Sequence, residues 1–250
     1  MAISGLVITY NEEKNIGKCI DALFEVCDEV IIVDSLSADN TVKIAEEKGA
    51  KVISQKFLGD GPQRTHGLPF CKNDWILNLD ADEFLDEDAK SFITSKKYLD
   101  GDFDAFSFRV KNFLGEELID FSGWYPDHKV RFFNRQTATP SNSIVHQKII
   151  AINEKKIPVH ILHYGWDSLE QIIAKKNQYS TWHANQLFNQ GKRVSRFKPV
   201  LNGTIAFLRC YFFKRGVFNG LDGITIALIQ AFFSYMKYAK LLKLQKQKKR

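Results

Sequence analysis

The chain has 250 residues, of which 44% are hydrophobic and 26% are charged, so it is long enough for a sizeable core. It contains no internal repeat and no long low-complexity linker, which excludes a repeat protein or a disordered chain. The four cysteines lack framework spacing, and no signal-peptide pattern precedes the first predicted strand. We therefore expect a reduced, cytosolic protein rather than a secreted disulfide scaffold.

The formal net charge of +6 belongs to the C-terminal end of the chain. Residues 192–250 contain 14 Lys and Arg against one acid, Asp222, which gives this segment a charge of +13 and leaves −7 for residues 1–191. A positive segment of this kind can bind nucleic acid, an anionic membrane or an anionic substrate.

The N-terminal part of the chain, as far as Ser54, predicts alternating strands and helices. Apolar runs typical of strands occur at residues 2–9, 29–34 and 51–54. Apolar residues at helical spacing predict helices between them, at residues 16–24 and 42–49. Asn11 is a candidate N-cap for the first helix. This alternation predicts a mainly parallel, doubly wound α/β sheet, whose ligands bind across the carboxyl ends of the strands.

A fourth apolar run, at residues 75–79, ends in two carboxylates, Asp80 and Asp82. By strand periodicity the two acids share one side, where they repel unless a cation or a proton lies between them. Mg²⁺ is usually held by one or two protein carboxylates together with substrate phosphates, so the pattern favours a metal–nucleotide ligand. An ordinary solvated turn would look similar, but the polar residues 9–12 and Asp34 are expected at the same edge of the sheet.

Four segments carry these polar residues in a recognisable order: Thr9-Tyr10-Asn11-Glu12-Glu13, Val33-Asp34-Ser35, Gly59-Asp60-Gly61-Pro62-Gln63-Arg64 and Leu79-Asp80-Ala81-Asp82-Glu83. In order and spacing they resemble the nucleotide-sugar half of family 2 inverting glycosyltransferases. The resemblance implies a GT-A fold, a Rossmann-like sheet that binds a UDP-sugar. Further segments resemble the bacterial lipopolysaccharide-core β-1,4-glucosyltransferase group, at residues 124–127, 131–133, 145–146, 163–164 and 211–216.

The resemblance also implies roles for individual residues. Asp82 would ligate Mg²⁺ or Mn²⁺ on the diphosphate, and Arg64 could offer a fork of donors to the same group. A surface arginine and, for Asp34, a helix N-cap are the alternative interpretations. We expect Glu83 to cap the helix that starts near Asp86. The residues implied in donor binding are Thr9, Tyr10, Asn11, Glu12, Asp34, Gln63, Arg64, Asp80 and Ala81.

An inverting transfer needs a base for the proton of the acceptor hydroxyl, and Asp or Glu is the usual supplier. Asp127 is our candidate because it follows the aromatic segment 121–126, which suits stacking on a sugar ring. A Pro-Asp turn residue is the alternative interpretation, and Asp120 is a weaker candidate. The resemblance implies that many relatives carry His-Glu where this chain has His146-Gln147, and glutamine cannot accept a proton.

The resemblance places four residues on the acceptor side: Trp124, Tyr125, His146 and His163. Histidine is also a common metal ligand, and four histidines lie between residues 128 and 163. Their spacing fits no standard zinc site, so we expect hydrogen-bonding roles and no zinc.

We expect two parts in the chain, a GT-A domain at residues 1–190 and a basic amphipathic helical extension at residues 195–250. Residues 223–236 carry no charge, but this run is too short to span a membrane and suits a segment in the interface, with Phe232, Phe233 and Tyr235 at the headgroups. A helix packed on the core and an oligomer contact are the alternatives.

The resemblance implies transfer of a hexose, expected to be glucose from UDP-glucose. The acceptor that it implies is an inner-core heptose of lipopolysaccharide at the cytoplasmic face of the bacterial plasma membrane. The sequence does not distinguish glucose from galactose or N-acetylglucosamine. Another glycolipid or polysaccharide acceptor is the first alternative, and a non-catalytic nucleotide-sugar-binding protein is the second. Nucleic-acid binding is not expected, because the basic residues alternate with apolar runs and no nucleic-acid module is visible.

Overall fold

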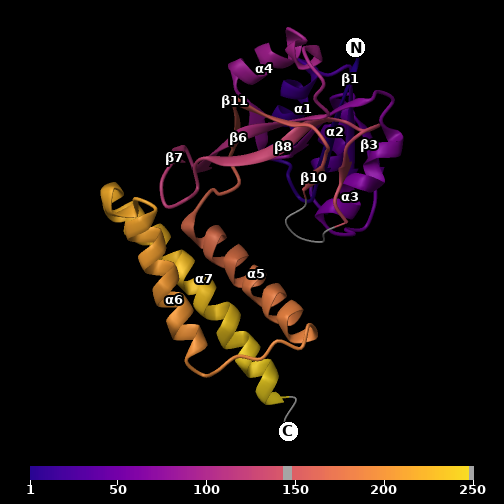
Figure 1. Cartoon of the computed structure of the whole chain (residues 1–250). Coiled ribbons are helices and arrows are strands. Elements are labelled where there is room, and N and C mark those ends of the chain that lie inside the picture. The colour runs from indigo at the N-terminus through magenta and orange to yellow at the C-terminus, as the bar shows by residue number, and fades with distance from the viewer. Residues whose placement is uncertain (143–147, 248–250) are drawn as a thin grey trace. The chain divides into compact units, whose positions relative to one another are not determined.

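The computed structural model describes residues 1–142 and 148–247 of the chain. These residues form two compact units (Figure 1). The first unit comprises Met1–Lys111 and Pro126–Gly165, and the second comprises Asn112–Tyr125 and Trp166–Arg250. The division differs from the expected boundary near residue 190, because the segment from Trp166 groups with the C-terminal helices.

A mixed sheet forms the first unit. Four strands run parallel in the order β3 (Lys51–Ser54), β2 (Glu29–Asp34), β1 (Ile3–Thr9) and β4 (Trp75–Asp80). The sheet continues from β4 through β8 (Asp127–Asn134), β6 (Ala105–Leu114), β11 (Glu154–His163) and β5 (Glu83–Leu85). The β4–β8, β8–β6 and β11–β5 pairs are antiparallel. The predicted α/β sheet is therefore present, with an antiparallel half that the sequence did not indicate.

Both faces of β1, β2 and β4 are buried, whereas the edge strand β3 is partly exposed. Successive side chains of β1 and β2 alternate between two hydrophobic clusters, so that Val7 and Ile32 belong to one cluster and Leu6 and Ile31 to the other. The unit also contains α1 (Ile16–Phe24), α2 (Thr41–Glu47), α3 (Asp60–Gly67) and α4 (Glu87–Thr94). Burial on two faces explains why these strands read as continuous apolar runs.

Three long helices dominate the second unit, and they are orange to yellow in Figure 1. Helices α5 (Leu169–Asn189) and α6 (Lys198–Leu208) both pack against α7 (Gly220–Gln247). A π-helical turn, Arg209–Phe213, and a 3₁₀ turn, Gly216–Asn219, join α6 to α7. The strand β7 (Glu117–Ile119) pairs with the end of β6 and brings Ile119 into contact with this helical core. The expected helical extension is thus confirmed.

Within the described residues, one helix is long and apolar enough to cross a membrane by length and composition. It spans Gly216–Gln247, with a mean hydropathy of 1.4 in its most apolar 18-residue window, and 28% of that window is buried. The expectation that this region is too short to span a membrane considered only the uncharged residues 223–236. It does not hold for the whole helix, which is long enough. A core helix of a soluble protein meets the same criterion.

Lys240 joins α7 to α5 through neutral oxygens. Its Nζ lies 2.7 Å from four oxygens of α5: the carbonyl and Oδ1 of Asn177, Oγ of Ser180 and Oγ1 of Thr181. Loss of hydration lowers the pKa of Lys240. Because an ammonium donates three hydrogen bonds, these oxygens satisfy it fully.

We expect Lys240→Met to destabilise the second unit by about 1–3 kcal/mol, because it removes hydrogen bonds to a charged donor. Urea denaturation followed by circular dichroism measures the change. Lys243→Met is the matched control, since Lys243 is an exposed lysine of the same helix. Equal unfolding midpoints for the two variants would show that the oxygens of α5 contribute nothing.

Candidate functional site

The candidate site lies where the parallel strands end. Thr9, Asp34 and Asp80 are the last residues of β1, β2 and β4, and the register pairs Thr9 with Asp34 and Ile8 with Asp80. The two β-α loops are tied to each other, because Asn11 Oδ1 accepts from the Ala38 amide at 2.8 Å. The sheet therefore gathers the predicted strand-end residues at one edge.

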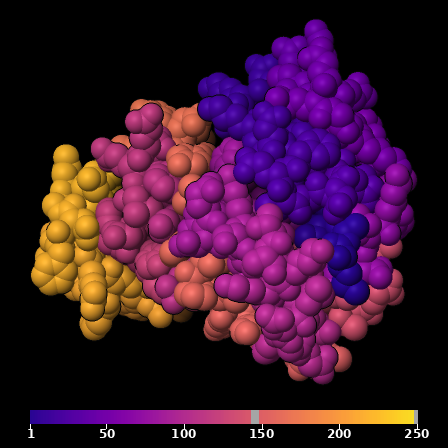
Figure 2. Space-filling view, turned by 90° about the horizontal axis from the view of Figure 1, so that it is seen from above, coloured from indigo at the N-terminus to yellow at the C-terminus, as the bar shows by residue number. Residues whose placement is uncertain are grey.

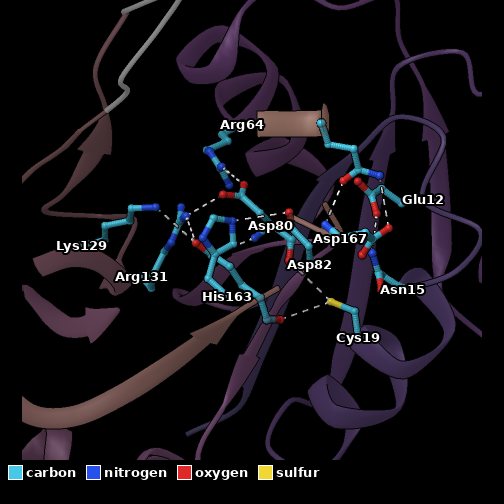
Figure 3. A network of polar contacts seen from close by, with 12 residues as sticks. Glu12, Asn15, Cys19, Arg64, Asp80, Asp82, Lys129, Arg131, His163 and Asp167 are labelled. Atoms are coloured by element: carbon cyan, nitrogen blue, oxygen red, sulfur yellow. Dashed lines mark hydrogen bonds and ion pairs between the residues drawn. The ribbon is translucent and has the colours of Figure 1, made fainter. Parts of the chain in front are cut away.

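Asp80 is held by two arginines (Figure 3). Its Oδ1 accepts from Arg64 Nη2, and its Oδ2 accepts from Arg131 Nη2 at 2.6 Å. Burial opposes ionisation of Asp80, but Arg131 and Arg64 outweigh it and hold the pKa of this carboxyl well below its usual value. Asp80 is therefore a charged anchor for two cationic side chains.

Arg64 is an internal residue. Only 3% of it is exposed, and its Nη1 donates to Asn78 Oδ1 at 2.5 Å. The surface-arginine interpretation is wrong, and the predicted diphosphate contact stays a prediction. The neighbouring Gln63 is fully buried and braces the preceding loop, where its Nε2 donates to the Gln55 carbonyl and its Oε1 accepts from the Leu58 amide.

Glu83 does not cap a helix, so that prediction is wrong. The cap of α4 is Asp86, whose Oδ1 accepts from the Ala89 amide at 2.9 Å. Glu83 is fully buried, its Oε1 lies 2.5 Å from Arg131 Nη2, and its Oε2 accepts from the Asp80 amide at 3.1 Å. It is the second carboxylate that Arg131 bridges.

A β-bulge places Arg131 in this network. In the β8–β6 register, Phe132 pairs with Phe106 and Val130 with Ser107, so Arg131 is the extra residue. Burial alone would lower the pKa of Arg131, but Asp80 and Glu83 raise it. No role for Arg131 was predicted from the sequence. Its place directly before two apolar residues, Phe132 and Phe133, was the available signal.

Asp82 faces His163. The distance from Asp82 Oδ2 to His163 Nε2 is 3.5 Å, and each side chain is 15% exposed. Burial would lower the pKa of His163, but hydrogen bonding and the charge of Asp82 raise it. The antiparallel pairing of β11 with β5 sets the approach, since His163 is in register with Glu83 and the Tyr164 amide donates to the Asp82 carbonyl.

Gly165 leaves room for this pair. A Cβ atom at Gly165 would lie 2.5 Å from His163 Nε2 and 3.1 Å from Asp82 Oδ2. Any side chain there would displace the imidazole, whereas glycine lets the backbone pass close to both groups.

Asp82 and His163 are the residues that could hold a divalent cation. Among the described residues no cluster of three or more His, Cys, Asp or Glu is arranged as a metal site. One carboxylate and one imidazole fit Mn²⁺, and Mg²⁺ is commonly bound through one or two carboxylates with phosphate oxygens and water completing the shell. The donor set therefore fits a cation that arrives with a nucleotide diphosphate.

The predicted donor-side loop is ordered by its own hydrogen bonds. Helix α1 starts at Ile16, so Asn11 is not its N-cap. Asp34 is no N-cap of α2 either, because α2 starts at Thr41 and Asn40 is at the cap position. Both Asp34 oxygens accept from Ser37, from the amide at 2.9 Å and from Oγ at 2.5 Å. Tyr10 is 59% exposed, and the buried Thr9 Oγ1 has no hydrogen-bond partner in the described residues.

The predicted acceptor-side residues have different outcomes. Asp127 is the first residue of β8, is exposed, and shares a strand face with Lys129, whose Nζ lies 3.5 Å from Glu83 Oε1. Trp124 packs in the second unit, with its ring centroid 6.2 Å from that of Trp166. Tyr125 also belongs to the second unit, and His146 lies outside the described residues.

Residues 4–156 match the family described as glycosyl transferase family 2. The chain is a family 2 glycosyltransferase. An uncharacterized glycosyltransferase of Rickettsia felis is 33% identical over 96% of this chain and 89% of its own length. The lipopolysaccharide core biosynthesis glycosyltransferase LpsC of Rhizobium meliloti is 29% identical over 96% of this chain and 92% of its own length.

Among solved structures, this glycosyltransferase is similar to glucosyl-3-phosphoglycerate synthase of Mycobacterium tuberculosis in complex with Mn²⁺, UDP and glucosyl-3-phosphoglycerate. The identity is 27% over 45% of this chain and 44% of that chain, with a TM-score of 0.35. The family match and the observed sheet confirm both the predicted family and the α/β GT-A fold.

We expect Arg131→Ala to destabilise the glycosyltransferase by about 3–5 kcal/mol, because it leaves the buried Glu83 without its main partner. Lys129→Ala is the control and should cost less than about 1 kcal/mol, since its side chain is 35% exposed and its contact to Glu83 is long. Urea unfolding measures both. Similar losses for the two variants would show that Arg131 is not the main support of Glu83.

Proposed function

We propose that this glycosyltransferase transfers glucose, a hexose, from UDP-glucose to an inner-core heptose of lipopolysaccharide. The transfer would invert the configuration at the anomeric carbon. The observation that carries the proposal is the pairing of Asp82 with His163 at the edge where the parallel strands end. Family membership supports sugar transfer, and the similarity to LpsC supports the lipopolysaccharide core as acceptor.

Asp82 and His163 would hold Mg²⁺ or Mn²⁺, which when bound neutralises negative charge on the departing UDP. Asp80 has both oxygens bound to arginines, which leaves the ligand role to Asp82. Arg64 and Arg131 keep Asp80 ionised and fix its position. They therefore act on the site through the strand end from which Asp82 projects.

The donor would lie along the ends of β1 and β2. Asp34 and the segment Thr9–Glu12 are proposed to hold uracil and ribose, with the exposed Tyr10 ring available to the base and Thr9 Oγ1 available as a hydrogen-bonding group. Gln63 and Ala81 complete the proposed donor side. The Gln63 side chain supports it by fixing the loop at residues 55–58.

Asp127 is the proposed base. It would accept the proton of the acceptor hydroxyl as the oxygen attacks the anomeric carbon. Its exposure and its place on the same strand face as Lys129 support this role. Trp124, Tyr125 and His146 stay the proposed acceptor-side residues, whereas the contact with Asp82 favours the cation site for His163.

The proposed setting is the cytoplasmic face of the bacterial plasma membrane, with the protein bound at the surface. The +13 charge of residues 192–250 and the apolar helix Gly216–Gln247 support contact with an anionic membrane. Association of copies through the same helices is the alternative, and no nucleic acid is a proposed partner.

A donor screen tests the proposal. The purified protein is incubated with Mn²⁺, purified core lipid and, in turn, UDP-glucose, UDP-galactose and UDP-N-acetylglucosamine, and transfer is followed by mass spectrometry of the lipid. We expect an increase of one hexose with UDP-glucose. Transfer only to another glycan would favour the alternative acceptor. UDP binding without turnover would identify a non-catalytic nucleotide-sugar-binding protein. Salt-dependent RNA binding with neither UDP binding nor turnover would identify a nucleic-acid-binding protein.

We expect Mn²⁺ to raise the affinity for UDP about tenfold or more, a usual size for coupling between two ligands. Asp82→Asn should remove most of this gain, because the amide is a poorer cation ligand and carries no charge. Isothermal titration calorimetry of UDP with Mn²⁺ and with EDTA measures it. Equal UDP affinities in the presence and absence of Mn²⁺ would contradict the metal role.

We expect Asp127→Asn to lower kcat about 10²–10⁴-fold, the usual contribution of a general base. UDP affinity in the presence of Mn²⁺ should stay unchanged, which distinguishes this variant from Asp82→Asn. Asp120→Asn is the matched control and should keep its activity. A loss confined to Asp120→Asn would move the base to that residue.

A further inference from the structure

The turn between α6 and α7 carries the most exposed large apolar side chains of the second unit. Phe213 is 84% exposed, Phe218 is 81% exposed and Leu221 is 79% exposed. We call residues 209–222 the apical turn. It belongs to the end of the unit that faces the viewer, in gold, in Figure 2. High exposure of three such side chains so close together in the chain marks an interaction surface rather than scattered surface residues.

This exposure is built into the fold. Cys210 and Gly216 of the turn are buried, and the Cys210 Sγ lies 3.6 Å from the Ser122 carbonyl. The Ser122 amide donates to the Lys214 carbonyl at 2.9 Å. A Cβ atom at Gly223 would lie 1.8 Å from the Gly216 carbonyl oxygen, so the two backbones touch. The contacts with Ser122 and Gly223 thus fix the backbone of the turn and leave its apolar side chains exposed.

The charges around the turn identify its partner. Arg209, Lys214 and Arg215 are exposed beside the apolar residues, against one acid, Asp222. Apolar side chains with adjacent Lys and Arg suit the interface of an anionic bilayer, where the apolar groups enter and the cations meet phosphates. A second copy of this chain would bring the same positive charge and would be repelled.

We propose that the apical turn inserts into the anionic leaflet and anchors the second unit to it. From the sequence, that contact was expected at Phe232, Phe233 and Tyr235. Phe232 and Tyr235 are 39% and 42% exposed, about half as much as the three most exposed apolar residues of the apical turn. Phe233 packs within the unit, with Lys176 Nζ 5.3 Å from its ring and the His183 ring 6.0 Å away. This proposal rests on the proposed function in one respect, namely that the acceptor is a membrane lipid.

Vesicle binding tests the proposal. Full-length protein is sedimented with vesicles of phosphatidylcholine alone and of phosphatidylcholine mixed with phosphatidylglycerol. We expect binding to the anionic vesicles and at least a tenfold loss of partitioning in the triple variant Phe213→Ser, Phe218→Ser, Leu221→Ser. The matched control is Phe197→Ser, Val200→Ser, Leu201→Ser, which changes three exposed apolar residues at the other end of α6. This control should bind as the natural protein does.

A second readout locates the inserted residue. The four cysteines are buried, so a polarity-sensitive dye attached to Leu221→Cys reports on the turn alone. Its emission should shift to the blue on addition of anionic vesicles, while the dye on Leu201→Cys should not respond. Equal vesicle binding by the two triple variants, or loss of self-association instead of lipid binding in the turn variant, would overturn the proposal. Resistance of the natural protein to carbonate extraction would do the same, because a spanning helix would then be the anchor.

The two proposals fail separately. UDP affinity with Mn²⁺ is measured on the turn variant, which alters no proposed donor residue. A protein that inserts through the turn but transfers no sugar would leave the anchor standing and refute the proposed function. A protein that turns over UDP-glucose but binds vesicles without the turn would support the proposed function and refute the anchor.

Discussion

The site depends on one buried ion network, in which Arg131 bridges Asp80 and Glu83 while Arg64 takes the second oxygen of Asp80. Three carboxylates so close in the chain would otherwise repel one another where solvent cannot screen them. The network neutralises two of them inside the protein. The third, Asp82, then stands opposite His163 on a strand end that is fixed from both sides. Charge pairing is thus what allows an acid-rich turn to exist at the end of a buried strand, and the cost of desolvating these ions is met by their mutual hydrogen bonds.

Sheet topology supplies what charge pairing cannot. Parallel strands bring Thr9, Asp34 and Asp80 to one edge although they are far apart in the sequence. The antiparallel half adds a different element, because β11 returns beside β5 and delivers His163 to Asp82 from a distant part of the chain. The bulge in β8 then directs Arg131 toward the two carboxylates. A parallel sheet alone would present acids at its edge with no partner for them.

These differences explain how much could be predicted from the sequence. The strands and helices as far as Ser54, the α/β sheet and the family followed from apolar periodicity and from motifs whose residues are close in sequence. The side-chain hydrogen bonds of Asp34, Asn11 and Glu83 could not be predicted in this way, because each depends on which loop lies beside the residue. Arg64 was assigned to the donor site by its motif, but its place in α3 and its burial were missed, since a single arginine gives no local sign of its partners. Arg131 was missed for the same reason, as a bulge leaves no pattern in one strand and appears only as a register between two.

The balance of charge at the site bears on why a cation would be needed there. Arg64, Arg131 and Lys129 carry three positive charges, and Asp80, Asp82 and Glu83 carry three negative ones, so the group is neutral when His163 is neutral. A neutral group offers a diphosphate little net attraction, and residues 1–191 as a whole are negative. A divalent ion on Asp82 and His163 would change the sign of the local field and would do so only when it is bound. Arg64 and Arg131 already pair with Asp80 and Glu83, so an ion at Asp82 would add positive charge beyond that of the two arginines.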